Sequence, residues 1–285
     1  MHARKLAIPD RRPSLPALYL RAATRRIISG QHLPEQGLRS WVTVDERRLA
    51  AYRRVCGFAE GSPMPATYPH VLALPLQLQL LTAKEFPFPL PGLVHLNNRI
   101  RLLRPLGGMS NLRIGVQVRN LQPHVQGATF DLLTEIDDAL GPLWEAESRL
   151  LCRGVTLDAR PARKNKASAP PLTELSRWQV PVDIGRRYAR VSGDYNPIHL
   201  TALSARLFGF PRPIAHGLWN KARILAALHE HLPSANIEIE VAFRRPVRLP
   251  GEVGLWVSAP GSNGAFKLSG AKGLEHLSGR WRPIA

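Results

Sequence analysis

An acid and an imidazole lie close together in the segment Ser-Gly-Asp-Tyr-Asn-Pro-Ile-His, residues 192–199. Gly193 and Pro197 end helical structure, so Asp194 and His199 are predicted to lie on a tight irregular loop. Such a loop can turn a carboxylate and an imidazole towards one point, and these are the groups that most often transfer protons in enzymes. Asn196 could stabilise the loop or offer its amide to a ligand. A plain turn with an incidental histidine is the alternative interpretation.

Two helices are expected to hold this loop. The first runs over Ile184–Ser192, after a strand at Trp178–Val182 and with Asp183 as a plausible N-cap. Gly193 then stands where a left-handed residue commonly ends a helix. The second runs over Gly217–His231, where apolar residues recur at helical spacing and predict a largely buried helix. Later strands are expected at Asn236–Arg245, Val253–Ser258 and Leu277–Trp281.

The chain contains an internal repeat. Tyr52–Gly57 matches Tyr188–Gly193 at an offset of 136 residues, and Pro65–His70 matches Pro211–His216 at an offset of 146. The second half therefore has ten residues, around 194–210, that the first half lacks. Each half is predicted to form a central apolar helix wrapped by an antiparallel sheet. The predicted domains are 1–157 and 172–285, joined by a basic Pro/Ala linker over 158–171.

Residues 188–199, followed by Ala202, Ala205 and the Ala215-His216-Gly217 turn, resemble the MaoC-like dehydratase family. This family comprises (R)-specific enoyl-thioester hydratases with the hotdog fold. The first half, from about Thr43 to Gly154, resembles the degenerate N-terminal hotdog of two-domain members. The resemblance implies an α+β fold, a double hotdog that forms a pseudo-dimer within one chain.

The resemblance also implies roles for individual residues. Asp194 and His199 would be the catalytic pair that polarises one water, and Asn196 would orient the substrate or the loop. The Gly217 amide would bind the thioester oxygen, because helix N-termini present unpaired N–H groups. Tyr188 and His216 are further candidate substrate-binding residues, although packing or loop-fixing is the favoured role of His216. One active site per chain is expected, because the first half lacks the loop.

The implied reaction is reversible hydration of trans-2-enoyl thioesters to (R)-3-hydroxyacyl thioesters, a hydro-lyase activity of fatty acid metabolism. It needs no metal or redox cofactor, and coenzyme A or acyl carrier protein carries the substrate. A hotdog thioesterase is one alternative. A protein that binds acyl thioesters or nucleic acid without catalysis is another.

The net charge of +18 favours anionic partners. Residues 1–150 hold 19 Lys and Arg against 12 acidic residues, and residues 151–285 hold 20 against 9, so both halves are basic. No nucleic-acid module is recognisable and the aromatic residues are not interleaved with basic clusters, so nucleic-acid binding is disfavoured. A homodimer is compatible with the sequence.

Other patterns have simpler explanations. His229-Glu230-His231 is interpreted as a solvated helix end rather than a metal site, and the glycine-rich run at Gly107-Gly108 as a turn. Cys56 and Cys152 are expected to be buried thiols. The N-terminus lacks a signal-peptide pattern and no apolar run reaches the ~20 residues of a membrane span, which predicts a cytoplasmic protein without membrane association.

Overall fold

The computed structural model describes residues 6–9, 13–25, 27–108, 110–157 and 170–284. Contacts divide the chain into two compact units. The first holds the described residues of 1–44, 72–98 and 110–167, and the second those of 45–71, 99–109 and 168–285. Most of the predicted linker, residues 158–169, lies outside the described residues. The segment 45–71 from the first half of the sequence thus groups with the second half.

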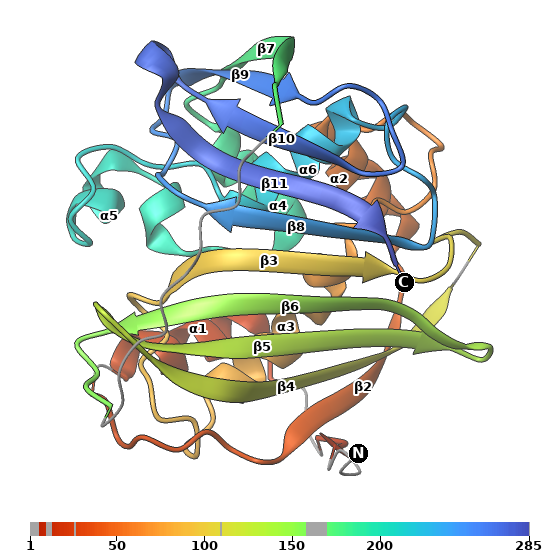
Figure 1. The fold of residues 1–285 in the computed structure, drawn as a ribbon. Helices are drawn as coiled ribbons and strands as arrows, with labels where there is room; N and C mark the ends of the chain where they lie inside the picture. Colours follow the sequence, from red (N-terminus) through yellow and green to blue (C-terminus); the bar gives the residue numbers. More distant parts are fainter. Residues whose placement is uncertain (1–5, 10–12, 26, 109, 158–169, 285) are drawn as a thin grey trace. The chain divides into compact units, whose positions relative to one another are not determined.

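The first unit is an antiparallel sheet with apolar helices on one face (Figure 1). Its strand order is β1-β2-β4-β5-β6-β3, and β1 pairs with β2 in parallel. The helices are α1 (Leu15–Thr24) and α3 (Pro69–Leu81), whose first residues belong to the second unit. The strands are β1 (Leu6–Ala7), β2 (Gly37–Thr43), β3 (Val94–Leu102), β4 (Asn111–His124), β5 (Gly127–Asp138) and β6 (Gly141–Arg153).

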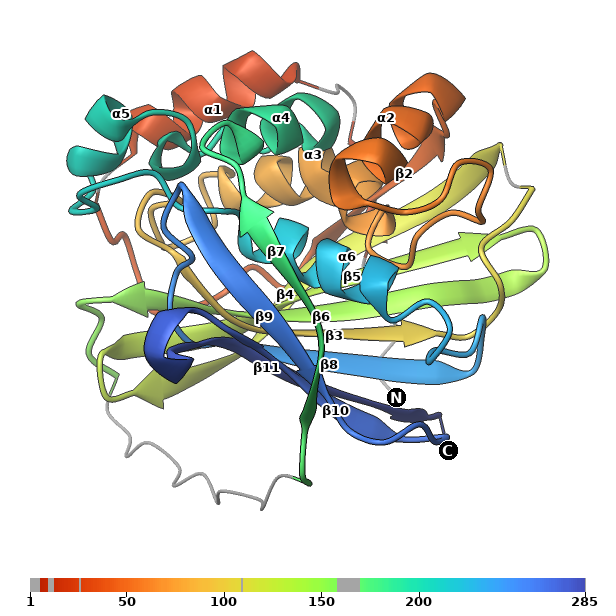
Figure 2. The ribbon, with the colours of Figure 1, turned by 90° about the horizontal axis from the view of Figure 1, so that it is seen from above.

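The second unit repeats this plan with the strand order β8-β11-β10-β9-β7 and antiparallel pairing. Helix α6 lies between this sheet and the pair α2 and α4 (Figure 2). The strands are β7 (Thr173–Val180), β8 (Ile237–Phe243), β9 (Gly251–Val257), β10 (Gly264–Ser269) and β11 (Glu275–Pro283). The helices are α2 (Glu46–Cys56), α4 (Ile184–Ser192), η1 (Pro197–His199), α5 (Ala202–Arg206), α6 (Gly217–Ala227) and η2 (Ala271–Gly273).

Local sequence signals place most of these elements correctly. The helix predicted over Ile184–Ser192 is confirmed, and Gly193 follows it with φ of 80° in the left-handed region. Asp183 occupies the N-cap position as predicted, and its side chain makes no capping hydrogen bond. The helix expected to reach His231 ends at Ala227. Strand β10 was not predicted from the sequence.

The repeat is visible in the backbone of α2 and α4. Each helix ends at a glycine with φ of 80°, Gly57 or Gly193, whose N–H donates to the carbonyl four residues earlier. The two helices also pack together, with Arg48 Nε donating to the Val191 carbonyl at 2.8 Å. Helix α6 is tied to α2 by Trp219, whose Nε1 donates to the Val55 carbonyl at 3.0 Å. The second copy of the repeat is therefore packed against a helix from the first.

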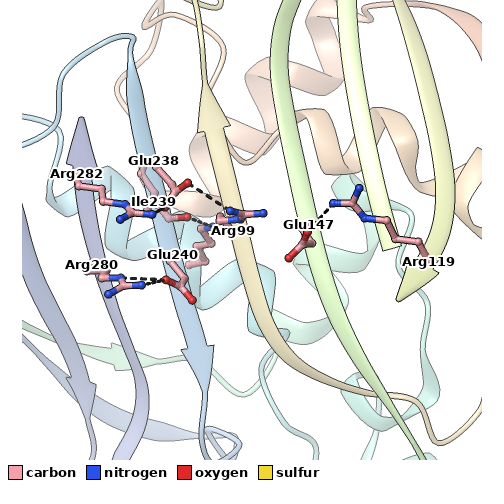
Figure 3. A network of polar contacts seen from close by, with 9 residues as sticks. Arg99, Arg119, Glu147, Glu238, Ile239, Glu240, Arg280 and Arg282 are labelled. Carbon is pink, nitrogen blue, oxygen red and sulfur yellow. Dashed lines mark hydrogen bonds and ion pairs between the residues drawn. The ribbon is translucent and has the colours of Figure 1, made fainter. Parts of the chain in front are cut away.

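Strand β8 separates an apolar face from a charged one. Ile237, Ile239 and Val241 are buried, because alternate side chains of a strand point to opposite faces. Glu238 and Glu240 lie between them and pair with Arg282 and Arg280 of β11, while Arg99 of β3 also approaches Glu238 at 3.6 Å (Figure 3). These cross-strand pairs fix the register of the sheet on its charged face.

A lysine is fully buried in the same unit. Lys221 of α6 donates from Nζ to the Ile239 carbonyl at 3.3 Å. Burial moves the pKa of Lys221 well below its usual value. Cys56 and Cys152 are free, buried thiols as predicted. Within the described part of the chain, no helix is long and apolar enough to cross a membrane.

Candidate active site

Side-chain and backbone hydrogen bonds close the loop between α4 and η1. The Asp194 N–H donates to Ser192 Oγ at 3.1 Å, and Asp194 Oδ1 accepts from the Asn196 N–H at 3.2 Å. Asn196 Oδ1 in turn accepts from the Ile198 N–H at 3.4 Å, which makes Asn196 the cap of η1. Pro197 suits the first position of this short helix, since its missing N–H would be unpaired there. The predicted irregular loop is therefore confirmed, and its polar residues stabilise it locally.

His199 is held in one tautomer. Its side chain is buried, and Nδ1 lies 2.8 Å from the Ile214 carbonyl oxygen. A carbonyl can only accept, so Nδ1 carries the proton and Nε2 presents a lone pair. Burial lowers the pKa of His199 to about 3, and the neighbouring His216 acts in the same direction. The imidazole is thus a neutral group whose Nε2 can accept a proton.

Asp194 is the more exposed member of the predicted pair, with 36% of its side chain accessible. Its backbone carbonyl accepts from His216 Nε2 at 3.0 Å, and its Oδ2 lies 3.8 Å from the same nitrogen. One ligand atom from each of Asp194, His199 and His216 lies within 4.8 Å of the others. The structure therefore brings together the two residues that the sequence singled out, with His216 as a third.

His216 connects this loop to the start of α6. Its ring stacks on that of His199, with centroids 3.6 Å apart and planes 26° apart, and lies 4.8 Å from the ring of Tyr188. Its Nδ1 is buried and has no hydrogen-bond partner among the described residues. Burial lowers the pKa of His216. The ring thus packs against His199 and Tyr188, and its hydrogen bond to the Asp194 carbonyl ties the loop to the start of α6.

The same three residues could hold a metal ion, because they offer a carboxylate and two imidazoles at close range. Two of the imidazole nitrogens, however, already donate to carbonyl oxygens: His199 Nδ1 to Ile214 and His216 Nε2 to Asp194. A metal would have to use His199 Nε2 and His216 Nδ1. A test of metal dependence therefore concerns these two nitrogens together with the Asp194 carboxylate.

Gly185 positions the loop although its role was not predicted from the sequence. A β-carbon at Gly185 would lie 1.9 Å from the carbonyl oxygen of His199, so the backbone of η1 lies directly against α4. Gly185 has no positive φ, and only this close approach requires a glycine here. Nothing in the local sequence indicates such a long-range contact. The Ile214 carbonyl was missed for the same reason.

The remaining predicted residues differ in their surroundings. Gly217 is half-buried at the first position of α6, and a β-carbon there would lie 2.9 Å from the Phe243 ring. Tyr188 is fully buried in α4, with its ring 6.0 Å from that of Tyr52. Burial raises the pKa of Tyr188 well above its usual value. Tyr188 therefore contacts His216 and Tyr52 from within the core.

Comparison with known proteins identifies relatives over most of the chain. Residues 162–279 match the MaoC like domain. The chain is 35% identical over 245 residues to 3-hydroxyacyl-thioester dehydratase X of Mycobacterium tuberculosis, which covers 85% of this chain and 86% of the relative. It is 31% identical over 146 residues to Enoyl-CoA hydratase 2, peroxisomal, of Arabidopsis thaliana. That alignment covers 44% of this chain and 45% of the relative.

Solved structures agree. The crystal structure of HtdX of Mycobacterium tuberculosis superposes with a TM-score of 0.74 at 32% identity, over 86% of this chain and 100% of that one. A MaoC-like dehydratase of Phytophthora capsici superposes with a TM-score of 0.70 at 22% identity, over 87% of this chain and 95% of that one. The predicted α+β double-hotdog fold is confirmed by these neighbours. By its sequence relatives and by its fold, this chain belongs to the MaoC-like dehydratase family.

Proposed function

We propose that Asp194 and His199 activate one water molecule for the reversible hydration of trans-2-enoyl thioesters to (R)-3-hydroxyacyl thioesters. The observation that supports this most is the fixed tautomer of His199, whose Nε2 presents a lone pair. One ring nitrogen of His199 also lies within 4.8 Å of an Asp194 carboxylate oxygen. The chain is a hydro-lyase of acyl thioesters, in keeping with relatives named 3-hydroxyacyl-thioester dehydratase and 3-hydroxybutyryl-CoA dehydratase.

In the hydration direction, the water oxygen attacks the β-carbon of the enoyl thioester. His199 Nε2 accepts one water proton as the C–O bond forms, with Asp194 holding the water. The π electrons of the double bond move towards the thioester carbonyl, which becomes enolate-like. The α-carbon then takes up the proton from His199 Nε2, and His199 returns to its neutral form. Proton transfer of this kind contributes about 10²–10⁴ in rate. Dehydration is the same sequence in reverse.

The developing negative charge lies on the thioester oxygen. The Gly217 N–H is suited to bind it, because the first N–H groups of a helix have no partner within the helix and lie at its positive dipole end. Losing one such donor typically costs about 10²–10³ in rate. Asn196 then has a supporting role, since its side chain caps η1 and so holds His199 in place. Tyr188 supports the site from the core rather than by contact with substrate.

No metal or redox cofactor takes part in this scheme, and coenzyme A or acyl carrier protein carries the acyl group. The basic surface of the chain suits either carrier, since both are anionic. We also propose that the enzyme works in the cytoplasm and can form a homodimer. The alternatives of thioester hydrolysis and of nucleic-acid binding are disfavoured by the Asp194 and His199 arrangement.

The test is hydration of crotonyl-CoA and of a longer enoyl-CoA, followed by loss of the enoyl chromophore, with chiral chromatography of the product. Asp194→Asn and His199→Ala should each lose about 10²–10⁴ in rate. Circular dichroism should show both variants folded. Activity that persists in both would contradict the proposed site, and an (S) product would contradict the proposed stereochemistry. Release of free CoA instead of a hydroxyacyl product would point to a thioesterase.

A further inference from the structure

The second compact unit holds a cavity that none of the candidate active-site residues lines. It has a volume of about 330 Å³. Its lining includes Glu46, Leu49 and Arg53 of α2, the loop residue Met64, and the turn Leu106–Gly108. Small-molecule sites typically measure about 300–1,000 Å³, so the cavity is large enough for a compact ligand.

The internal repeat explains why there is space here. With the glycines that end α2 and α4 aligned, Leu49 corresponds to Gly185 and Arg53 to Ala189. In the second half that helix face is covered, because the His199 backbone lies against Gly185 and Ala189 is fully buried. The first half lacks the ten residues of this loop. The equivalent face of α2 lines the cavity instead.

One residue of the lining is a cation whose side chain includes an unpaired donor. Arg53 Nε is buried and has no hydrogen-bond partner within the described residues. Tyr68 is fully buried nearby, and its hydroxyl is also without a partner in that part of the chain. Burial raises the pKa of Tyr68 to about 12, and the charges of Glu46 and Arg53 also act on its hydroxyl. Buried donors that lack partners are costly, so a ligand oxygen that reached Arg53, the one of these two residues that lines the cavity, would recover free energy.

The rest of the lining mixes apolar side chains with Ser62, Glu46 and glycine backbone. Leu49, Met64 and Leu106 are all buried side chains that contribute hydrocarbon to the wall. Glu46 is the acidic residue of the lining, and its charge opposes a second negative charge on any ligand. One cation opposed by one carboxylate therefore favours a ligand with a single negative charge. The three apolar side chains leave room for only a short carbon chain beside them.

We propose that this cavity is an accessory binding site for a small aliphatic carboxylate. Arg53 binds the carboxylate oxygens, and the carbon chain packs against Leu49, Met64 and Leu106. The site is independent of the proposed reaction, since it shares no residue with Asp194, His199 or Gly217. It occupies the place where the first repeat lacks a catalytic loop.

The test is a calorimetric titration of the full chain with hexanoate. Wild-type protein should show saturable binding, and Arg53→Gln should weaken it by about tenfold or more, because a charge-assisted hydrogen bond is lost. Arg54→Gln is the matched control, since Arg54 is next to Arg53 in the sequence but is exposed and does not line the cavity. It should bind hexanoate like the wild type. His199→Ala should also retain binding, which separates this site from the acyl site.

A second variant tests the site without touching Arg53. Gly107 has no positive φ, and a β-carbon added there would meet no atom within 4 Å, so Gly107→Glu can be accommodated and adds a negative charge to the wall. Hexanoate binding should be lost while circular dichroism and crotonyl-CoA hydration stay unchanged. The proposal is overturned if wild-type protein shows no saturable binding or if Arg53→Gln and Gly107→Glu bind as the wild type does. Equal binding of inorganic phosphate would overturn the preference for a monoanionic carboxylate.

Discussion

The imidazole rings of His199 and His216 stack face to face, with centroids 3.6 Å apart, inside the second compact unit. Both rings are buried, and each donates one N–H to a backbone carbonyl. His199 is thereby tied to the Ile214 carbonyl, and the Asp194 carbonyl is tied to His216. The stacked pair thus links the Asp194–His199 loop to the start of α6.

His216→Phe should keep the stacked ring but lose the hydrogen bond to the Asp194 carbonyl. We expect kcat for crotonyl-CoA hydration to fall about 10- to 100-fold, because a small displacement of a catalytic group is costly, with a smaller change in KM. The acid limb of kcat/KM should also move to higher pH, because His216 lowers the pKa of His199. His229→Phe, at an exposed site, is the control. An unchanged pH profile in His216→Phe would mean that His216 only fills space.

Gly185→Ala should displace the catalytic loop, because the added β-carbon would lie 1.9 Å from the His199 carbonyl oxygen. Hydration should slow about 10²-fold through misplacement of His199. The comparison is Gly107→Ala, where the added methyl group meets no atom within 4 Å. Thermal unfolding distinguishes a displaced loop from a protein that has failed to fold. Full activity in Gly185→Ala would show that the loop can shift without consequence.

Acid should destabilise the protein through its buried histidines. The folded-state pKa of His199 is lowered to about 3 and that of His216 is also lowered, whereas unfolded histidines titrate near about 6.5. Below that pH the unfolded chain binds protons that the folded chain excludes. The free energy of unfolding should therefore fall with decreasing pH, by up to about 1.4 kcal/mol per pH unit for each histidine. Urea titrations between neutral pH and pH 4 would measure this, and His199→Phe should show a shallower slope.

Removal of metal should leave the activity unchanged. Two of the four imidazole nitrogens of His199 and His216 already donate to carbonyl oxygens, and the proposed water activation uses the lone pair of His199 Nε2. Dialysis against a chelator followed by the crotonyl-CoA assay is the measurement. A loss of rate that zinc restores would show that Asp194, His199 and His216 form a metal site.

Lys221→Met should stabilise the folded protein near neutral pH. Burial keeps the pKa of Lys221 well below its usual value, so the folded chain binds the proton less well than the unfolded chain does. Wild-type stability should therefore rise with pH up to about 10, and Lys221→Met should remove that part of the rise. Exposed Lys272 provides the control variant Lys272→Met. A large loss of stability in Lys221→Met would show that the hydrogen bond to the Ile239 carbonyl stabilises the fold by more than burial of the amine destabilises it.

Features encoded by neighbouring residues could be predicted from the sequence. The helix Ile184–Ser192, its end at Gly193 and the irregular loop to His199 follow from local rules, and the structure confirms them. The pairing of Asp194 with His199 also follows from this short segment. Assignment to a family and a fold depended on a dense motif rather than on periodicity.

Contacts between distant segments could not be predicted. The Ile214 carbonyl fixes the tautomer of His199 across fifteen residues, and the His199 backbone lies against Gly185. The helix expected to reach His231 ends at Ala227, and the polar residues His229–His231 form a turn in which the His231 N–H donates to the Leu228 carbonyl. Strand β10 was missed because it is only six residues long, begins at Gly264 and is followed by Gly270, and these glycines indicate a turn.

The packing of α2 against α4 and α6 has a consequence for where the chain can be divided. A fragment made of residues 172–285 would lack the helix that covers Tyr188 and accepts the hydrogen bond from Trp219. A cut in the predicted linker should therefore expose apolar surface on α4 and α6 rather than release a stable catalytic domain. The copy of the repeat without the Asp194–His199 loop is therefore part of the folding unit that holds this loop, and the boundary of that unit does not coincide with the boundary between the repeats.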